Sequence, residues 1–539
     1  MKKIVSMLLA LVMLVGMLAG CNKDDGSSTA EGSTEKVLRW NLGPAPESLD
    51  PMLMGTYSMQ VVNNTFEGLM RMYDGELIPG LAESYEVSDD GLVYTFHLRD
   101  SKWSDGEPLT ADDFVFSWIR MLNPELKMYY STQMFYIKNA QAYYNGECTA
   151  EEVGVKALDD KTLQVELESP TAFFLSLTAF NIYYPVREDV VDDEGAWSLN
   201  PETYLCTGPF TLSEYNLNEN LVLVKNENYW DADRVKLDKI VVTFIDDENS
   251  AMTAYRAGDI DVFKGVPTQE IATLRASDDE FHVVPMLGVE YYVFNNEKEP
   301  LNDVRVRKAL TLAVDRTALV ENVTKAGELP CAGDVTHDIL LSDGTEFRDA
   351  AGDYDIDVSK ALVDEAQALL AEAGYPNGEG FPELTLVYND VDMKKSVAEA
   401  IQQMWKENLG ITIKLEGVEN SVLSEKRSSG DFDIARWGWS ADYPDPATYL
   451  SVWVSDGSSN CAGMKNEEFD ECISKATVTE GTERDELLLR AEEILIEEEC
   501  AILPLYETVD TCMIRSNLVN WDKTGFNGWF FGFADLVEE

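Results

Sequence analysis

The sequence has very little histidine and lacks the common signatures of catalytic sites. The three histidines, His97, His282 and His337, lie far apart, and none begins the His-Glu-x-x-His motif of a zinc protease. There is no phosphate-binding P-loop, and the Gly-Glu-Gly run at 378–380 lacks the third glycine of a dinucleotide-binding loop. Because a hydrolase needs an activated nucleophile or a metal, we expect a protein that is not an enzyme and that carries no cofactor and no metal.

Basic residues are also scarce. There are 42 Lys and Arg against 98 Asp and Glu, a formal net charge of −56. A surface this acidic repels phosphate backbones, so we expect no nucleic-acid partner. Cysteine is limited to eight widely spaced residues without a Cys-x-x-Cys pair. A chain of this length needs no disulfides to fold, so the sequence leaves open whether the seven cysteines after Cys21 are paired or free.

The N-terminus predicts export. A basic start, MKK, precedes an apolar run at 4–19, which is shorter than the about 20 residues of a membrane-spanning helix and typical of a secretory signal peptide. The run LAGC that ends at Cys21 resembles the lipobox of bacterial lipoproteins. We predict a signal peptide at 1–20, a lipid anchor on Cys21, a flexible tether at 21–36, and a location on the extracytoplasmic face of the cell membrane. The alternative is an ordinary signal peptide with an incidental cysteine.

The remaining chain of about 500 residues is long enough for two or three domains. In its first half, LVYTFHL at 92–98 alternates like a half-buried strand, and Thr110 is placed to cap a helix. In the second half, a helix predicted at 359–374, with Ser359 as its cap, precedes a strand–helix–strand–helix–strand series within 384–437. Such βαβ units predict a mostly parallel sheet and mixed α/β lobes, with a ligand cleft where the lobes meet.

The run DFDIARWGWSADYPDPATYL carries the most informative chemistry. Asp442 follows the carboxyl end of a predicted strand, where ligand-facing groups of α/β lobes gather. Its carboxylate suits an ammonium group. Trp437 and Trp439 can supply apolar or cation–π walls, and Arg436 can face a carboxylate. These side chains suit a zwitterion with separated ends. The alternative is that Asp442 and Asp445 only cap turns and that Arg436 pairs with one of them.

Together with other blocks, this run resembles a known family. The blocks include YTFHLRDSKWSDGEPLTADDFVFSW at 94–118, ALDDKTLQVEL at 157–167, RAGDIDV at 256–262, FNNEKEPLNDVRVRKAL at 294–310 and FDIARWGWSADYPDP at 432–446. They are similar, in the same order, to blocks of the oligopeptide-binding proteins of bacterial ABC importers, the solute-binding proteins of the peptide/nickel family. The resemblance covers about 37–536 of the chain.

The resemblance implies an α/β, periplasmic-binding-protein-like fold of two lobes with an extra inserted domain, three domains in all (cluster C type). Domain I would combine 37–57, 182–287 and 509–539, the inserted domain II would be 58–181, and domain III would be 288–508. Two crossing segments near residues 287 and 508 would form a hinge, and a peptide would lie enclosed between domains I and III.

The resemblance also implies site residues. Asp442 would bind the α-ammonium of a peptide, and Arg436 would bind the carboxylate of a short one. The other implied contacts are Gly438, Trp439, the backbone of Ala441, Tyr291, Arg427 and Tyr506, with Tyr129 or Tyr130 from domain II.

Some positions depart from the family pattern. Where some members use a His for the carboxylate of a longer peptide, this sequence has Met393 beside Lys394. Where some have a cysteine pair beside the site, it has Gly288 and Ser440. These departures leave the preferred peptide length open and do not affect the ammonium site.

We therefore expect a monomeric binding protein that encloses peptides of about two to five residues and delivers them to the permease subunits of an ABC importer. One alternative is a non-peptide solute such as a metal chelate, haem, an opine or a sugar. Asp442 argues against these, because a buried carboxylate is costly unless an amine meets it. A secreted peptide hydrolase is disfavoured by the scattered histidines, whereas a peptide receptor without transport would have the same site.

Overall fold

The computed structural model describes residues 35–53, 55–192, 195–455, 457, 459–524 and 528–538. The predicted signal peptide, Cys21 and most of the predicted tether lie outside these residues. From Lys36 on, the chain forms one compact unit, Lys36–Glu539. Within the described ranges, no helix is long and apolar enough to cross a membrane, and the seven cysteines found there are all free.

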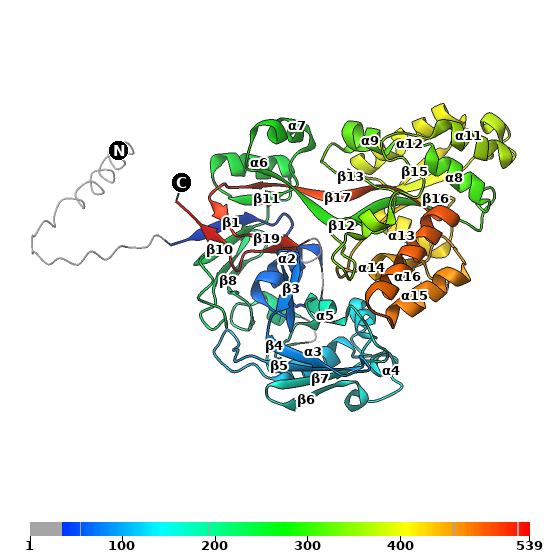
Figure 1. Cartoon of the computed structure of the whole chain (residues 1–539). Helices are drawn as coiled ribbons and strands as arrows, with labels where there is room; N and C mark the ends of the chain where they lie inside the picture. The colour runs from blue at the N-terminus through cyan, green and yellow to red at the C-terminus, as the bar shows by residue number, and fades with distance from the viewer. Residues whose placement is uncertain are drawn as a thin grey trace, which may run out of the picture. The chain divides into compact units, whose positions relative to one another are not determined.

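A large mixed sheet runs through this unit (Figure 1). Its strands follow the order β15-β14-β16-β12-β17-β11-β1-β10-β9-β8, and β13 pairs with β17 beside this path. The bounds are β1 Val37–Asn41, β8 Phe210–Asn216, β9 Asn220–Lys225, β10 Lys239–Thr243, β11 Val262–Lys264, β12 Phe281–Phe294, β13 Leu329–Pro330, β14 Thr385–Asn389, β15 Lys414–Val418, β16 Ile434–Ser440 and β17 Ile502–Ile514.

The two long strands β12 and β17 join the two halves of this sheet, as Figure 1 shows. They are antiparallel, with register shifts between Pro285 and Val289 and between Glu290 and Tyr291. Such irregularities bend paired strands, and the predicted crossing points near residues 287 and 508 fall inside these two strands. The division of the chain into domains I, II and III stays a prediction.

The predicted βαβ series lies at one end of the sheet. β14, α12 (Asp392–Leu409), β15, α13 (Asn420–Ser429) and β16 follow in that order, and β14 pairs in parallel with both β15 and β16. α12 buries Val397, Ile401 and Trp405, which share one helix face, and it ends at Gly410 in the left-handed conformation. Because β14 and β16 are parallel, the segments that follow them leave the same edge of the sheet.

A second, antiparallel sheet lies within the segment predicted as the inserted domain. Its order is β4-β5-β7-β6, with β4 Ala82–Val87, β5 Val93–Leu98, β6 Val155–Asp159 and β7 Thr162–Glu166. β5 alternates between half-buried and buried residues, as predicted from LVYTFHL. α3 (Ala111–Met121) begins after Thr110, which forms a capping box with Asp113, so the predicted cap is confirmed.

Helices pack around both sheets. The principal ones, besides those above, are α2 Thr56–Thr65, α6 Glu248–Ala257, α7 Thr268–Ser277, α8 Val304–Leu312, α11 Val363–Glu372, α14 Ala447–Leu450, α15 Glu467–Thr477 and α16 Gly481–Glu493, with the short 3-10 helix η1 at Tyr129–Met134. The largest apolar core contains Trp40, Trp118 and Trp453, and a second core between α8 and α12 contains Trp405.

One predicted helix start was wrong. α11 begins at Val363 after Leu362, and Ser359 does not cap it. The backbone N–H and the hydroxyl of Ser359 both donate to Asp357 Oδ1, at 3.0 and 2.6 Å. This local turn competes with a helix for the same donors, which is why Ser and Asp favour turns as well as caps.

Candidate ligand-binding site

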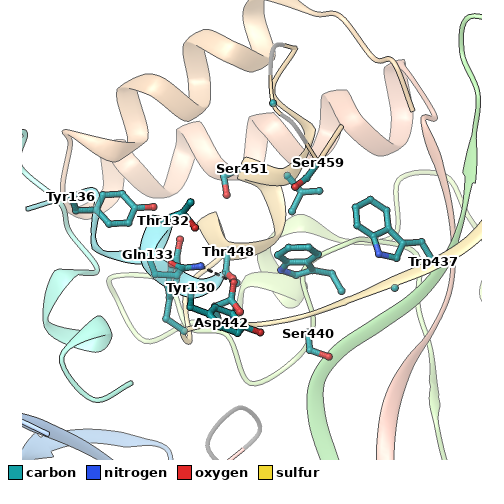
Figure 2. A pocket seen from close by; sticks show the side chains of 15 residues that line it. Tyr130, Thr132, Gln133, Tyr136, Trp437, Ser440, Asp442, Thr448, Ser451 and Ser459 are labelled. Carbon is teal, nitrogen blue, oxygen red and sulfur yellow. Dashed lines mark hydrogen bonds between the residues drawn. The ribbon is translucent and has the colours of Figure 1, made fainter. Parts of the chain in front are cut away.

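A cavity of about 640 Å³ opens beside the carboxyl end of β16 (Figure 2). Two segments far apart in the sequence line it, one around η1 and the other from β16 into the loop and short helices that follow. The lining residues are Tyr130, Thr132, Gln133, Tyr136, Trp437, Gly438, Trp439, Ser440, Asp442, Tyr443, Thr448, Ser451, Val452, Gly457 and Ser459. Five of the predicted site residues are among them: Tyr130, Trp437, Gly438, Trp439 and Asp442. Among the described residues of this lining, Asp442 is the one charged side chain.

Asp442 is largely enclosed and has no cation partner among the described residues. Gln133 Nε2 donates to Asp442 Oδ2 at 2.9 Å, and the Asp442 N–H donates to Thr448 Oγ1 at 3.1 Å. Burial raises the pKa of Asp442 to about 6, and the hydrogen bond from Gln133 opposes that rise. An ionised carboxylate in such a place is costly unless a cation meets it. The geometry therefore suits a ligand that brings an ammonium group.

Neither Asp442 nor Asp445 pairs with Arg436. The alternative interpretation, in which Arg436 pairs with one of these two aspartates, is therefore wrong on this point. Asp445 Oδ1 accepts hydrogen bonds from Arg484 Nη2 at 2.6 Å and from the Ala447 N–H at 2.8 Å. It therefore has both the turn-capping role and a buried cation of its own. Asp442, three residues earlier, has neither a capping bond through its carboxylate nor a cation among the residues that the structure describes.

Arg436 pairs instead with Glu290 of the neighbouring strand β12. Arg436 Nε donates to Glu290 Oε1 at 2.6 Å, and Arg436 Nη2 donates to Oε2. Lys394, in the first turn of α12, donates to Glu290 Oε2 at 3.0 Å. Burial raises the pKa of Glu290, whose side chain is 2% exposed, but the two cations outweigh burial and leave that pKa below its usual value. Two cations on one carboxylate leave a net positive charge beside the cavity strand.

The guanidinium group of Arg427 lies over the ring of Trp437. Its guanidinium carbon is 4.7 Å from the centre of the Trp437 ring, and Nη1 donates to the Arg436 carbonyl at 3.4 Å. Burial lowers the pKa of Arg427. Trp437 also meets Trp439 edge-on, with ring centres 5.9 Å apart. The Trp439 indole N–H is buried and finds no acceptor in the described part of the chain.

Three predicted contacts are buried and are not among the residues that line the cavity. Tyr291 is fully buried, with its ring edge-on to Trp453 at 5.7 Å. The Ala441 N–H donates to the Leu287 carbonyl at 2.7 Å, and Tyr506 is buried on β17 opposite Glu290. Contacts of these residues with a ligand stay predictions.

The structure also places Tyr130, Gly288 and Ser440. Tyr130 lines the cavity. Gly288 and Ser440, the positions of the cysteine pair in some family members, face each other across β12 and β16.

Sequence reasoning missed Gln133 and Glu290. Gln133 is 309 residues from Asp442, and no motif marks it. Glu290 left a signal that could have been used, because it is the lone charged residue in the run GVEYYVF, and a charge inside an apolar strand requires a buried partner.

Comparisons with known proteins confirm the family resemblance. The model of the family described as "Bacterial extracellular solute-binding proteins, family 5 Middle" matches residues 76–461. The oligopeptide-binding protein OppA of Bacillus subtilis is 36% identical over 535 residues, 96% of each chain. The unliganded open form of the murein tripeptide-binding protein MppA of Escherichia coli has a TM-score of 0.80 at 32% identity, covering 94% of this chain and 98% of that one. Listeria monocytogenes OppA bound to peptide has a TM-score of 0.75 at 29% identity, covering 94% and 100%. The chain therefore belongs to the bacterial extracellular solute-binding proteins of family 5.

Proposed function

We propose that this protein captures short peptides through their charged ends and delivers them to the permease subunits of an ABC importer. The observation that carries the proposal is Asp442, an enclosed carboxylate on a cavity wall without a cation among the described residues. The name of the relative OppA, an oligopeptide-binding protein, supports peptides as the ligand class.

Asp442 would hold the α-ammonium, and the net positive charge of Arg436, Glu290 and Lys394 would attract the carboxylate. Arg436 already uses two donors on Glu290, so the carboxylate would be held by the excess charge of the group and not by a free guanidinium. Arg436 and Asp442 are six residues apart, at most about 20 Å along an extended chain. A peptide of about two to five residues, with a similar rise per residue, fits between such end charges. Main-chain pairing would add affinity without selecting side chains.

Ligand capture would involve closure of the two halves of the sheet about β12 and β17. The register shifts in this strand pair support a bend there. The TM-score is also higher for the unliganded open form of MppA than for peptide-bound OppA. This supports the view that the described conformation is the open one, from which a ligand would select a closed state.

The signal peptide at 1–20, the lipid on Cys21, the monomeric state and the three-domain division belong to the same proposal. The MKK start, the apolar run and LAGC support the signal peptide and the lipid, as does the extracellular character of the family. Mass spectrometry of the membrane fraction would test the anchor, because a lipidated Cys21 must be the N-terminal residue of the mature chain.

The ligand test uses the mature protein purified without denaturation. We expect native mass spectrometry to show a series of co-purified peptides, and calorimetry to show binding of tri- and tetra-alanine that Asp442→Ala abolishes. Asp431→Ala is the matched control, since that side chain is 78% exposed and 3.7 Å from Lys426, and binding should be unchanged. Clean ligand-free protein with no heat from any peptide would reject peptides as the ligand and favour another solute.

A further inference from the structure

The two long strands β12 and β17 lose their regular pairing at the predicted hinge. Residues 286–288 of β12 lie opposite Thr508 alone, with a regular pair on each side. Thr508 Oγ1 donates to the Gly288 carbonyl at 3.2 Å. Extra residues on one strand bend a strand pair and leave backbone groups without partners in the ladder. The bend therefore depends on contacts from outside the two strands.

Two adjacent residues of the segment that follows β13 supply such contacts to both strands. The Tyr449 hydroxyl donates to the Leu287 carbonyl of β12 at 3.0 Å and accepts from Thr336 Oγ1 at 2.9 Å. The next residue, His337, reaches β17. Its Nδ1 lies 2.7 Å from Glu507 Oε1, and its backbone N–H donates to the same carboxylate at 3.2 Å. Thr336 and His337, here called the hinge brace, therefore connect β12 with β17 where they bend.

The hinge brace is anchored to a buried ion pair. Glu492 of α16 is fully buried, and its Oε1 accepts the backbone N–H groups of Asp334 and Val335 at 2.8 and 2.7 Å. Arg348 Nη1 donates to the same oxygen at 2.9 Å. The brace follows Val335 directly, so its position is set by these contacts before any ligand arrives.

The contact between His337 and Glu507 can change its charge near neutral pH. Glu507 is 3% exposed, and His337 is its one cation partner among the residues that the structure describes. An ionised carboxylate only accepts, so Nδ1 carries a hydrogen. The hydrogen bond to Glu507 and the charge of Glu507 raise the pKa of His337 above its usual value, although burial opposes the rise. Protonation therefore converts a neutral hydrogen bond into a charge-assisted pair.

The other ionisable groups around this pair modify the effect but do not replace it. They are Glu346, Arg348, Asp338, Cys331 and Tyr449. Glu346 raises the pKa of His337 and Arg348, on α10 (Phe347–Ala351), lowers it. Asp338, the next residue in the chain, is exposed. Burial raises the pKa of both the cysteine and the tyrosine well above the usual values, so neither titrates near pH 7.

We propose that His337 is a protonation-dependent positioning residue of the hinge, which holds the described bend while its imidazole is charged and releases it when the proton leaves. This rests on the proposed function and adds a control of closure by pH. Because closure would have to release the bend, a charged His337 would weaken ligand binding, and ligand binding would release the proton to solvent.

The test counts the protons released when trialanine binds at about pH 7.5, by calorimetry in buffers of different ionisation enthalpy. His337→Asn is the test variant, since its amide nitrogen can take the place of Nδ1 and does not titrate. His97→Asn is the matched control, because His97 lies 3.9 Å from Glu86 on the second sheet, away from the hinge. Asp442, with a pKa of about 6, is largely ionised at this pH. Its residual proton and any proton taken up by the peptide are common to all three proteins.

We expect the wild type and His97→Asn to release at least about 0.2 proton more per peptide than His337→Asn. The ratio of the wild-type Kd to that of His337→Asn should fall by about twofold or more between about pH 6.5 and about pH 8.5. If His337→Asn does not fold, Glu507→Gln serves instead. It removes the charge that holds the proton on His337, so the extra release at about pH 7.5 should disappear.

Equal proton release by the wild type and these variants would overturn the proposal, as would a ratio of Kd values that rises with pH. If the wild type bound no peptide, the proposed function would fail, and small-angle X-ray scattering of the ligand-free proteins would then decide on the brace. A radius of gyration that falls with rising pH in the wild type and stays constant in His337→Asn would support it. The same radius in both proteins at each pH would overturn it.

Discussion

Replacing Asp442 by Asn should stabilise the ligand-free protein while removing ligand binding. Asn has the same size and still accepts the hydrogen bond from Gln133, but it carries no charge. In the wild type, burial raises the pKa of Asp442 from 3.8 to about 6. A difference of about two pKa units corresponds to about 3 kcal/mol of folding free energy.

The direction in which folding stability changes with pH follows from proton binding to Asp442. The folded protein holds the Asp442 proton more tightly than the unfolded chain does, so stability falls as the pH rises from about 4 to about 6 and is then constant. Asp442→Asn avoids this loss. We expect the variant to gain up to about 3 kcal/mol at pH 8 and close to nothing at pH 3.5. Enclosed charges that cost stability but serve binding are common in functional sites.

Guanidinium unfolding of protein freed of ligand measures the effect from the midpoint and the slope. Asp445→Asn is the control, since it leaves Arg484 buried without its partner. The side chains of Asp445 and Arg484 are 13% and 9% exposed, so this change should cost about 3 to 5 kcal/mol of folding free energy. If Asp442→Asn were neutral or destabilising at pH 8 while Asp445→Asn behaved as expected, the assigned burial cost of Asp442 would be wrong.

Two further pairs of variants test the cations beside the cavity and the buried tyrosines. Glu290→Gln should cost about 3 kcal/mol by leaving two half-buried cations without their buried partner. Glu297→Gln, in an exposed ion pair, should cost less than about 1 kcal/mol. Since the pKa of Glu290 is depressed, its contribution should be present at neutral pH and be lost as the pH falls below the ordinary pKa of a glutamate. Equal guanidinium midpoints for the two variants at neutral pH would contradict this. Tyr291→Phe and Tyr292→Phe each remove a buried hydroxyl that has no partner among the described atoms, so neither should lower the thermal midpoint. Only Tyr291→Phe should weaken trialanine binding in calorimetry, and equal affinities of the two variants would reject Tyr291 as a ligand contact.

Local sequence patterns predicted much of the secondary structure. The alternation in LVYTFHL gave β5, and the helical spacing of Val397, Ile401 and Trp405 gave the buried face of α12. Thr110 was predicted correctly as a cap because its partner, Asp113, is three residues away. Ser359 was not, because Asp357 competes for its N–H and hydroxyl. In both cases a nearby aspartate decided whether the residue caps a helix or forms a local turn. The sequence pattern alone cannot decide between a cap and a turn.

The sequence by itself determined the family, the βαβ series and the presence of Asp442 at the end of β16, because each depends on residues close together in the chain. Only the tertiary structure decided the partners of the charged groups. It paired Arg436 with Glu290, which is 146 residues away, and placed Gln133 on Asp442 across 309 residues. The physical reason is that enclosed charges and polar groups take the partner that the folded chain brings within hydrogen-bond distance, and spacing along the sequence carries no information about that distance.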